Sequence, residues 1–165
     1  EELVKCSDLL TQFGGHPMAA GLSLEEENVE RFRRKLNEQS GLTEEDLVEK
    51  VTIDVPMPIH YIRKDLVQEL SLLEPFGKGN EKPLFAQKNL WISQMRVFGK
   101  NRNVVKMRLT DENGYPMDGV YFGNGDEFAE EGRGKRKISI VYYPDINMYQ
   151  GRESLQVIIR HYQFD

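Results

Sequence analysis

The chain has 165 residues, of which 39% are hydrophobic and 30% are charged, and its formal net charge at pH 7 is −5. This length suits one ordinary domain or two small ones, and the composition is typical of a soluble globular protein. The single cysteine, Cys6, excludes an internal disulfide framework and a zinc site built on cysteines. No apolar run approaches the length of a membrane span and no secretory leader opens the chain, so we expect a cytoplasmic protein with no membrane partner.

The charge is unevenly distributed along the chain. Residues 1–50 carry 6 basic and 12 acidic side chains, whereas residues 51–165 carry 16 basic and 15 acidic ones. The negative total argues weakly against a general nucleic-acid binder. Residues 88–110, however, carry six basic side chains and no acidic ones, and we call these six the basic stripe. They are Lys88, Arg96, Lys100, Arg102, Lys106 and Arg108.

The first fifty residues are predicted to form helices and one short strand. Apolar residues between Leu3 and Leu10 indicate the end of a helix, which the glycines at 14–15 stop. Small side chains over 19–24 predict a buried strand. Apolar residues three and seven positions apart predict a second helix over 25–40, with a glycine just past its end. Because the chain begins with Glu1 and enters a helical pattern at once, we expect it to be a piece of a longer protein.

The middle of the chain reads as a connecting segment. Thr43, with Asp46 three residues later, is typical of a capped short helix. A strand is predicted over 52–55, where the prolines at 56 and 58 stop it. Leucine and isoleucine repeat every three to four positions over 62–73 and predict a helix. The following stretch, EPFGKGNEKP at 74–83, is a loop rich in turn residues.

After residue 84 the hydrophobic period changes to two, which indicates strands. Turn residues at 99–101 and 112–114 separate the first three, and one helical turn fits 123–132, between the third and the fourth. Five strands with a small helix in this place match the OB fold, a partly open Greek-key barrel, although an SH3-like barrel also has five strands. The predicted strands are 84–98, 104–110, 115–122, 136–143 and 154–162.

The stretch GGHPMAAG, which begins at Gly14, has two interpretations. Gly14 and Gly15 can adopt positive φ, so that successive amides converge on an anion, and His16 can donate a hydrogen bond to a phosphate oxygen. The alternative is a tight turn after a helix, in which His16 is merely packed. Composition alone favours the turn, because short glycine motifs recur by chance.

The same stretch resembles the signature of the DHH-associated domain found in phosphodiesterases of the DHH superfamily. Two further segments, LLEPFGKGNEKPLF at 72–85 and NMYQGRESLQ at 147–156, resemble the RecJ family of single-strand-specific exonucleases. The three segments occur in the RecJ order and together span nearly the whole chain. The first alone is shared with oligoribonucleases and cyclic-dinucleotide phosphodiesterases, so another DHH-family phosphodiesterase is an alternative.

The resemblance implies an α+β chain in three parts. Residues 1–48 would be the C-terminal part of an α/β DHH-associated domain. Residues 49–83 would supply a connecting strand, helix and loop, and residues 84–165 a five-stranded OB-fold β-barrel.

The resemblance also implies that metal binding and substrate binding are carried out by different parts of the longer protein. In such enzymes the DHH lobe binds divalent metals through aspartates and histidines, and the glycine-histidine motif holds the substrate backbone against them. No Asp-His-His triplet occurs in this sequence. We therefore expect no catalytic residue, metal site or cofactor in this chain, with manganese or magnesium bound elsewhere in the longer protein. Gly14, Gly15 and His16 are the implied phosphate-binding residues.

The basic stripe is the candidate nucleic-acid interface. Lys106 and Arg108 lie two apart on one predicted strand and so share a face, which Arg96 could join from the neighbouring strand. An electropositive face attracts phosphates and exposed aromatic rings stack on bases, although a charged strand is more often just a solvated sheet face. The predicted nucleic-acid contacts are Arg96, Lys100, Arg102, Lys106, Arg108 and Tyr149.

Two more segments have open interpretations. The loop at 74–83 could form an anion-binding nest, but its prolines and Phe76 favour a connector that packs the preceding helix onto the barrel. The second basic cluster, RGKRK at 133–137, suits a mobile turn and has no assigned role.

The leading hypothesis is a substrate-binding, C-terminal piece of a single-stranded-DNA-specific 5′-to-3′ exonuclease that acts in recombination and repair, with single-stranded DNA as its partner. The rival is a non-enzymatic OB module that docks a single-strand-binding protein or a replication protein. The salt dependence of binding separates the two, because phosphate contacts weaken steeply with salt whereas apolar docking changes little.

Overall fold

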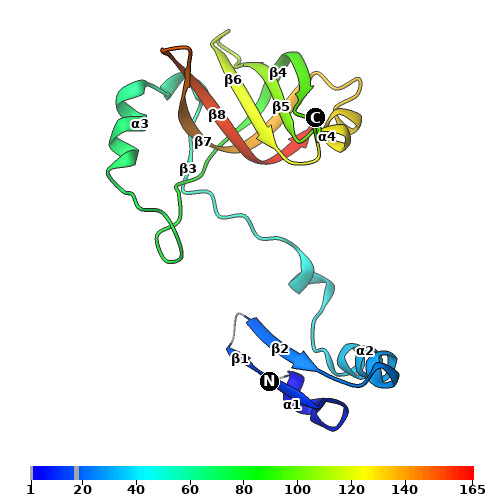
Figure 1. Ribbon diagram of the computed structural model, residues 1–165. Coiled ribbons are helices and arrows are strands. Elements are labelled where there is room, and N and C mark those ends of the chain that lie inside the picture. Colours follow the sequence, from blue (N-terminus) through cyan, green and yellow to red (C-terminus); the bar gives the residue numbers. More distant parts are fainter. Residues whose placement is uncertain (1, 17–18) are drawn as a thin grey trace. The chain divides into compact units, whose positions relative to one another are not determined.

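The computed structural model describes residues 2–16 and 19–165 and divides the chain into two compact units, residues 1–50 and 51–165 (Figure 1). The first unit contains two α-helices, three short 3₁₀ helices and a two-stranded antiparallel sheet among its described residues. Its elements are α1 (Glu2–Lys5), η1 (Ser7–Leu9), β1 (Gln12–His16), β2 (Ala19–Ser23), η2 (Glu26–Asn28), α2 (Val29–Gln39) and η3 (Glu44–Leu47).

The predicted helix over 25–40 is confirmed by η2 and α2, and the predicted cap by Thr43, whose backbone N–H donates to Asp46 Oδ2 at 2.8 Å. Two other expectations were wrong. The glycines at 14–15 do not stop a helix but lie within β1, and β2 is exposed instead of buried. The physical reason is that a two-stranded sheet has too little area to bury its own faces.

The second unit contains a sheet with a small helix inserted among its strands. Its elements are β3 (Val55–Pro56), η4 (Ile59–Tyr61), α3 (Lys64–Ser71), β4 (Phe85–Phe98), β5 (Val104–Thr110), β6 (Pro116–Phe122), α4 (Gly125–Glu131), β7 (Lys137–Tyr149) and β8 (Arg152–Phe164). The five predicted strands correspond to β4 to β8, and the predicted helical turn to α4. The predicted helix over 62–73 corresponds to α3.

The strands β7 and β8 are longer than predicted. Pro144, just past the predicted strand end, instead lies inside β7 opposite Val157 of β8. A proline lacks the N–H donor, but β7 pairs with β4 only up to Tyr142, so no ladder on that edge needs a donor from Pro144. The hairpin therefore continues to a turn in which Gln150 and Gly151 have φ of 49° and 74°.

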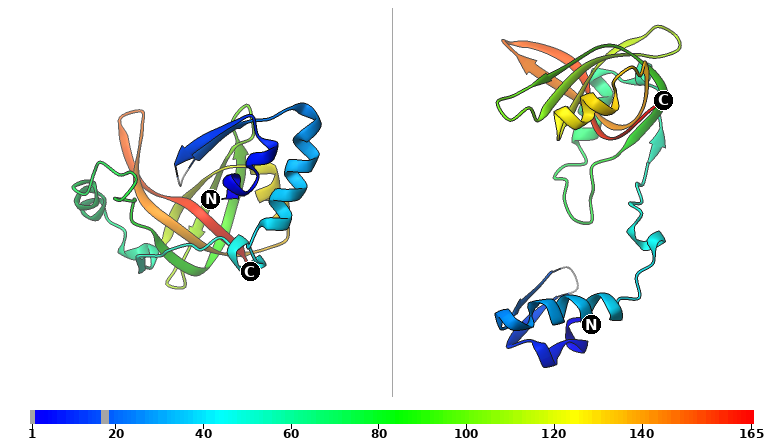
Figure 2. Two further views of the ribbon diagram at one scale, coloured as in Figure 1. Left: turned by 90° about the horizontal axis from the view of Figure 1, so that it is seen from below. Right: turned by 90° about the vertical axis from the view of Figure 1, so that its right-hand side faces the viewer.

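The sheet has the strand order β3-β4-β5-β6-β8-β7, and a further pairing between β4 and β7 closes five of these strands into a ring (Figures 1 and 2). Within the ring only β6 and β8 run parallel. The helix α4 lies between β6 and β7 in sequence and contacts β4 and β5. This topology is the predicted α+β arrangement with an OB-type order of strands.

The core fills the ring. Phe128 of α4 is fully buried and stacks on Tyr121 at a centroid distance of 4.7 Å. Gly119 admits no side chain, because a Cβ there would lie 2.9 Å from Leu109 Cδ1. The buried core residues include Leu90, Val105, Met107, Leu109, Met117, Ile138, Ile140, Tyr142, Val157 and Ile159.

The connecting segment is fastened to the ring by polar contacts. The Tyr142 hydroxyl donates to the Met57 carbonyl at 2.7 Å, and burial raises its pKa above the usual value. In the loop at 74–83, Asn80 Nδ2 donates to the carbonyl oxygens of Leu73 and Pro75 at 2.8 and 3.0 Å. These contacts support the interpretation of this loop as a structural connector.

Asp111 is the one charged side chain buried among the described residues, and it joins η4 to the β5–β6 turn. Its carboxylate accepts hydrogen bonds from the backbone N–H groups of Asn113 and Tyr115 at 2.9 and 2.8 Å and contacts His60 Nδ1 at 2.8 Å. Burial alone would raise the pKa of this carboxyl, but the three hydrogen bonds outweigh burial and hold the pKa below its usual value.

We expect Asp111→Asn to lower the free energy of unfolding at pH 7 by about 2 kcal/mol, because buried donors lose their charged acceptor. A carboxyl whose pKa is lowered by folding stabilises the protein above the unfolded pKa of about 3.9 and loses that contribution as pH falls through the folded value. The difference in the free energy of unfolding between the parent protein and Asp111→Asn should therefore narrow below about pH 4. Urea unfolding at pH 7, 5 and 3 measures this difference, and Glu112→Gln, at an exposed residue of the same turn, is the control. A difference that stays constant down to pH 3 contradicts the assignment.

Candidate nucleic-acid interface

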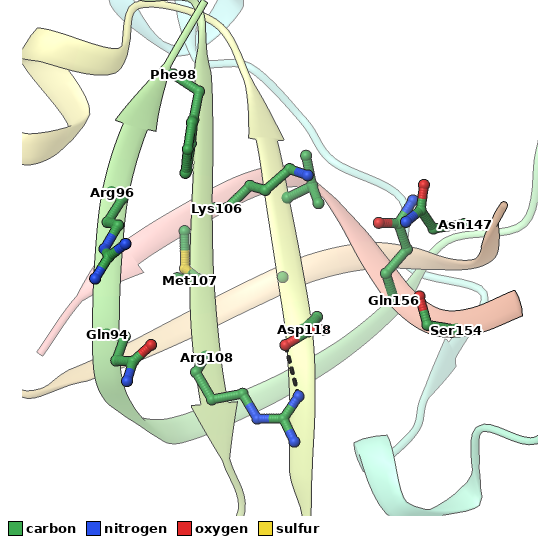
Figure 3. A pocket seen from close by; sticks show the side chains of 12 residues that line it. Gln94, Arg96, Phe98, Lys106, Met107, Arg108, Asp118, Asn147, Ser154 and Gln156 are labelled. Carbon is green, nitrogen blue, oxygen red and sulfur yellow. Dashed lines mark hydrogen bonds and ion pairs between the residues drawn. The ribbon is translucent and has the colours of Figure 1, made fainter. Parts of the chain in front are cut away.

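The outer face of β4, β5 and β6 carries a groove of about 510 Å³ (Figure 3). The buried side chains of Val105, Met107 and Leu109 alternate along β5 with those of Lys106 and Arg108, so Lys106 and Arg108 point away from the core into the groove. The lining residues are Gln94, Arg96, Phe98, Lys106, Met107, Arg108, Asp118, Gly119, Val120, Asn147, Ser154 and Gln156.

Two cross-strand rows place the basic side chains in this groove. Arg96 of β4 lies directly opposite Lys106 of β5, and the next row brings Gln94 opposite Arg108. Directly opposed residues have Cβ atoms about 5 Å apart. The prediction that Arg96, Lys106 and Arg108 share a face is confirmed by this register.

Of the three basic residues in the groove, Arg108 forms an ion pair, whereas Arg96 and Lys106 do not. Arg108 Nη1 contacts Asp118 Oδ1 at 2.6 Å, so a carboxylate on β6 already neutralises it. Among the ion pairs of the described residues, none involves Arg96 or Lys106. Figure 3 shows the Lys106 ammonium reaching across β6, on the same side as Asn147. Arg96 and Lys106 are therefore the uncompensated cations of the groove.

The tip of the β7–β8 hairpin extends the groove. A second hollow of about 420 Å³ is lined by Lys106, Asn147, Tyr149, Gln150, Arg152 and Ser154. Three of these residues, Lys106, Asn147 and Ser154, also line the first groove, so the two hollows are continuous. Tyr149 is 67% exposed and presents its ring at this end. The predicted contact Tyr149 thus joins Lys106 in one surface.

Two predicted contacts lie outside the groove. The Arg102 Nε donates to both carboxylate oxygens of Asp126, at 2.7 and 2.9 Å, and this hydrogen bonding lowers the pKa of the Asp126 carboxyl. Lys100 lies in the turn between β4 and β5 and lines neither hollow. The basic stripe therefore does not form one surface. Lys100 and Arg102 lie in the turn, where side chains do not alternate between two faces as they do along a strand.

The sequence prediction missed the polar side chains that complete the groove. Gln156 Nε2 donates to Asp145 Oδ2 at 2.7 Å, and Gln156 lies opposite Asp118 across the parallel pair β6–β8. Asn147 and Ser154 face each other across the β7–β8 hairpin. Gln94 precedes Arg96 by two positions on the same strand, and the other three lie in the segment 147–156 that resembles RecJ, so each had a signal in the sequence.

The glycine-histidine motif lies in the exposed β1–β2 hairpin. Gly14 lies opposite Gly21 and His16 opposite Ala19, and Gly15 has a positive φ of +152°. A Cβ on Gly14 would meet nothing within 4 Å. The Gly14–Gly21 pair therefore leaves bare backbone that a ligand can approach closely. Pro17 and Met18 of the motif lie outside the described residues.

No set of metal ligands accompanies these surfaces. Within residues 2–16 and 19–165, no three histidine, cysteine, aspartate or glutamate side chains come together as metal ligands would. No helix of the described chain is long and apolar enough to cross a membrane.

Comparison with known proteins gives the family. The model of the RecJ OB domain matches residues 53–161. The chain belongs to the RecJ OB domain family. The match spans the ring, the groove and most of the connecting segment, and it favours the OB fold over the SH3-like alternative.

Named relatives extend the similarity beyond the OB domain. The single-stranded-DNA-specific exonuclease RecJ of Bacillus subtilis is 37% identical over 164 residues, which is 97% of this chain and 20% of that protein. The Escherichia coli protein of the same name is 32% identical over 92% of this chain and 26% of its own length. The chain thus spans a fifth to a quarter of the relatives it matches.

A solved structure has the same fold. The crystal structure of RecJ from Thermus thermophilus in complex with Mg2+ matches 98% of this chain and 24% of that chain, with a TM-score of 0.76 and 23% identity. A second crystal structure of the Thermus thermophilus protein is a complex with Mn2+.

Gly15 is the residue of the motif that cannot be replaced. Its φ is +152°, and a Cβ there would lie 2.3 Å from the Ala19 carbonyl oxygen. We expect Gly15→Ala to destabilise the β1–β2 hairpin by more than about 1 kcal/mol, and Gly14→Ala to be tolerated. Amide hydrogen exchange of β1 and β2 by NMR measures this. Equal protection in the two variants would show that the hairpin does not depend on Gly15.

Proposed function

We propose that this chain is the single-stranded-DNA-binding part of a longer RecJ exonuclease, and that the strand lies in the groove on β4, β5 and β6. The observation that carries this proposal is the opposed pair Arg96–Lys106, two cations that line the groove and have no carboxylate partner among the described residues. Uncompensated cations on a sheet face attract phosphates without regard to base sequence.

The path of the strand follows from the two hollows. Phosphates would contact Arg96 and Lys106, and the exposed ring of Tyr149 at the hairpin tip would stack on a base. The amides of Gln94, Asn147 and Gln156 offer donors and acceptors beside the cations. In OB folds the second and third strands, the loop between the first and second and the loop between the fourth and fifth bind oligonucleotides. These correspond here to β5, β6, the β4–β5 turn and the β7–β8 turn.

The glycine-histidine hairpin would hold a phosphate near the bond to be cleaved. The bare Gly14–Gly21 pair lets a sugar-phosphate backbone approach, and His16 supplies a side-chain donor at the end of β1. Hydrolysis needs the substrate held in line while metal ions activate water, and those metals, manganese or magnesium, would be bound by the part of the longer protein that this chain lacks. His16 would orient the phosphate and not act as a general base.

The longer protein would then degrade single-stranded DNA from its 5′ end during recombination and repair. The names of the relatives support the substrate and the reaction. Docking of a single-strand-binding protein is the competing use of the same surface.

Lys106→Glu tests the groove. It should weaken binding of a labelled dT12 oligonucleotide by about fivefold or more in 50 mM salt, because it reverses a charge that contacts phosphate. The slope of log K against log salt should also flatten by about 0.7. Fluorescence anisotropy at several salt concentrations measures both quantities.

Lys78→Glu is the matched control, since it makes the same charge change at an exposed lysine of the connecting loop at 74–83, which lines neither hollow. It should change the affinity by less than about twofold, because screening weakens a distant exposed charge. If both variants bind equally well, DNA does not use this face. Binding of a single-strand-binding protein that resists salt would then support the docking interpretation.

His16→Ala in the longer protein tests the hairpin. Turnover on single-stranded DNA with Mn²⁺ should fall by roughly a hundredfold, since one donor to a developing charge is lost. The melting temperature should stay within a few degrees, because His16 is exposed. Gln12→Ala on the same strand is the control. A His16→Ala protein that cleaves at the parental rate but melts much earlier would show that His16 is structural.

This chain by itself should not hydrolyse DNA.

A further inference from the structure

Trp91 lies on the same face as the groove because of an irregularity in β4. Trp91 is opposite Thr110 and Gln94 is opposite Arg108, so three residues of β4 correspond to two of β5, with a register shift between Ile92 and Gln94. Ile92 and Met95 pack against the core on either side of this bulge. Without the bulge, strict alternation would turn Trp91 inward. The bulge instead aligns Trp91 with Gln94, Arg96 and Phe98 along one outer edge.

Trp91 is an exposed aromatic ring in a basic environment. It keeps 45% of its surface accessible, and Lys137 Nζ lies 4.4 Å from the centroid of its ring. Lys137 is also its cross-strand partner on β7. Arg136 and Lys135, both exposed, come directly before Lys137.

The cluster RGKRK at 133–137 is held in place beside this ring. The backbone N–H of Ile92 donates to the Arg136 carbonyl oxygen at 2.9 Å, and the Asp165 N–H donates to the Lys137 carbonyl oxygen at 3.1 Å. Arg133 is paired with Glu130, so its charge is compensated. The end of this cluster therefore lies in β7 beside β4, whereas the mobility of the turn stays a prediction.

We propose that Trp91 and Lys137 form a second subsite for single-stranded nucleic acid, in which a base stacks on the indole and a neighbouring phosphate contacts Lys137 or Arg136. This inference rests on the proposed function, because the DNA strand that lies in the groove would leave the groove along β4. Trp91 lies five positions from Arg96, about 15 Å along the strand. A DNA strand that contacts Arg96 reaches Trp91 by continuing past Gln94.

The chemistry of the site favours a base over an anion alone. Every base has an aromatic face, and stacking on an aromatic side chain tolerates any sequence. A cation beside the indole adds an attraction for the phosphate on either side of the stacked base. An acidic peptide would satisfy the lysine and the arginine but would leave the exposed ring uncovered.

Trp91 is the only tryptophan of the chain, so its fluorescence reports on this subsite alone. Titration with dT12 should quench the emission of Trp91 with the same midpoint as the anisotropy of a labelled dT12. Polyglutamate at equal charge carries no bases and should not quench it. Quenching by polyglutamate equal to that by dT12 would overturn the stacking proposal in favour of a general anion site.

Variants separate this subsite from the groove. Trp91→Ala should lower the affinity for dT12 about tenfold, within the range for loss of one stacked base, and Trp91→Phe should retain it within about threefold. Tyr61→Ala removes another exposed ring, from η4, and should have no effect. Circular dichroism and thermal melting of each variant confirm that it is folded.

The outcomes distinguish the two proposals. If dT12 binds and Lys106→Glu weakens binding, while Trp91 emission stays constant and Trp91→Ala binds normally, the subsite is wrong and the groove stands. If dT12 does not bind at any salt concentration, both are wrong.

Discussion

The pairing of β4 along both of its edges is the constraint on which the second unit depends. Residues 85–91 pair with β7 and residues 91–98 pair with β5, so one strand closes the ring of five. Closure gives every strand of the ring an inner and an outer face, and alternation then separates a packed core from a polar surface. The change of partner occurs at Trp91, which pairs with both Thr110 and Lys137.

Much of this unit could be predicted because its strands alternate regularly. The short turn at 99–101 makes β4 and β5 a hairpin, and this sets Arg96 beside Lys106. The ends of β7 and β8 could not be predicted, since Pro144 looks like a terminator unless one knows that its edge of β7 is unpaired at that point. In the β1–β2 hairpin the strand predicted over 19–24 is confirmed by β2, whereas β1 could not be predicted, because its two glycines look like a helix stop.

The candidate site was predictable to the extent that it lies on one strand pair. Lys106 and Arg108 follow from a spacing of two, whereas Gln156 reaches the groove only through the parallel pairing of β6 with β8. The outward direction of Trp91 could not be inferred from the sequence, because it depends on a bulge that a single sequence does not reveal. Lys100 and Arg102 are close to the strand residues in sequence but not in the groove, because the turn between β4 and β5 interrupts the alternation.

The pairing of Arg108 with Asp118 has a consequence for rates. A phosphate that arrives at Arg108 must displace a carboxylate, and when it leaves, the carboxylate can return. While a phosphate occupies Arg108, the Asp118 carboxylate is left without its partner beside that phosphate, which opposes binding of the phosphate and favours its release. Under the proposed function, Arg108 would therefore release a phosphate sooner than Arg96, which has no carboxylate partner among the described residues.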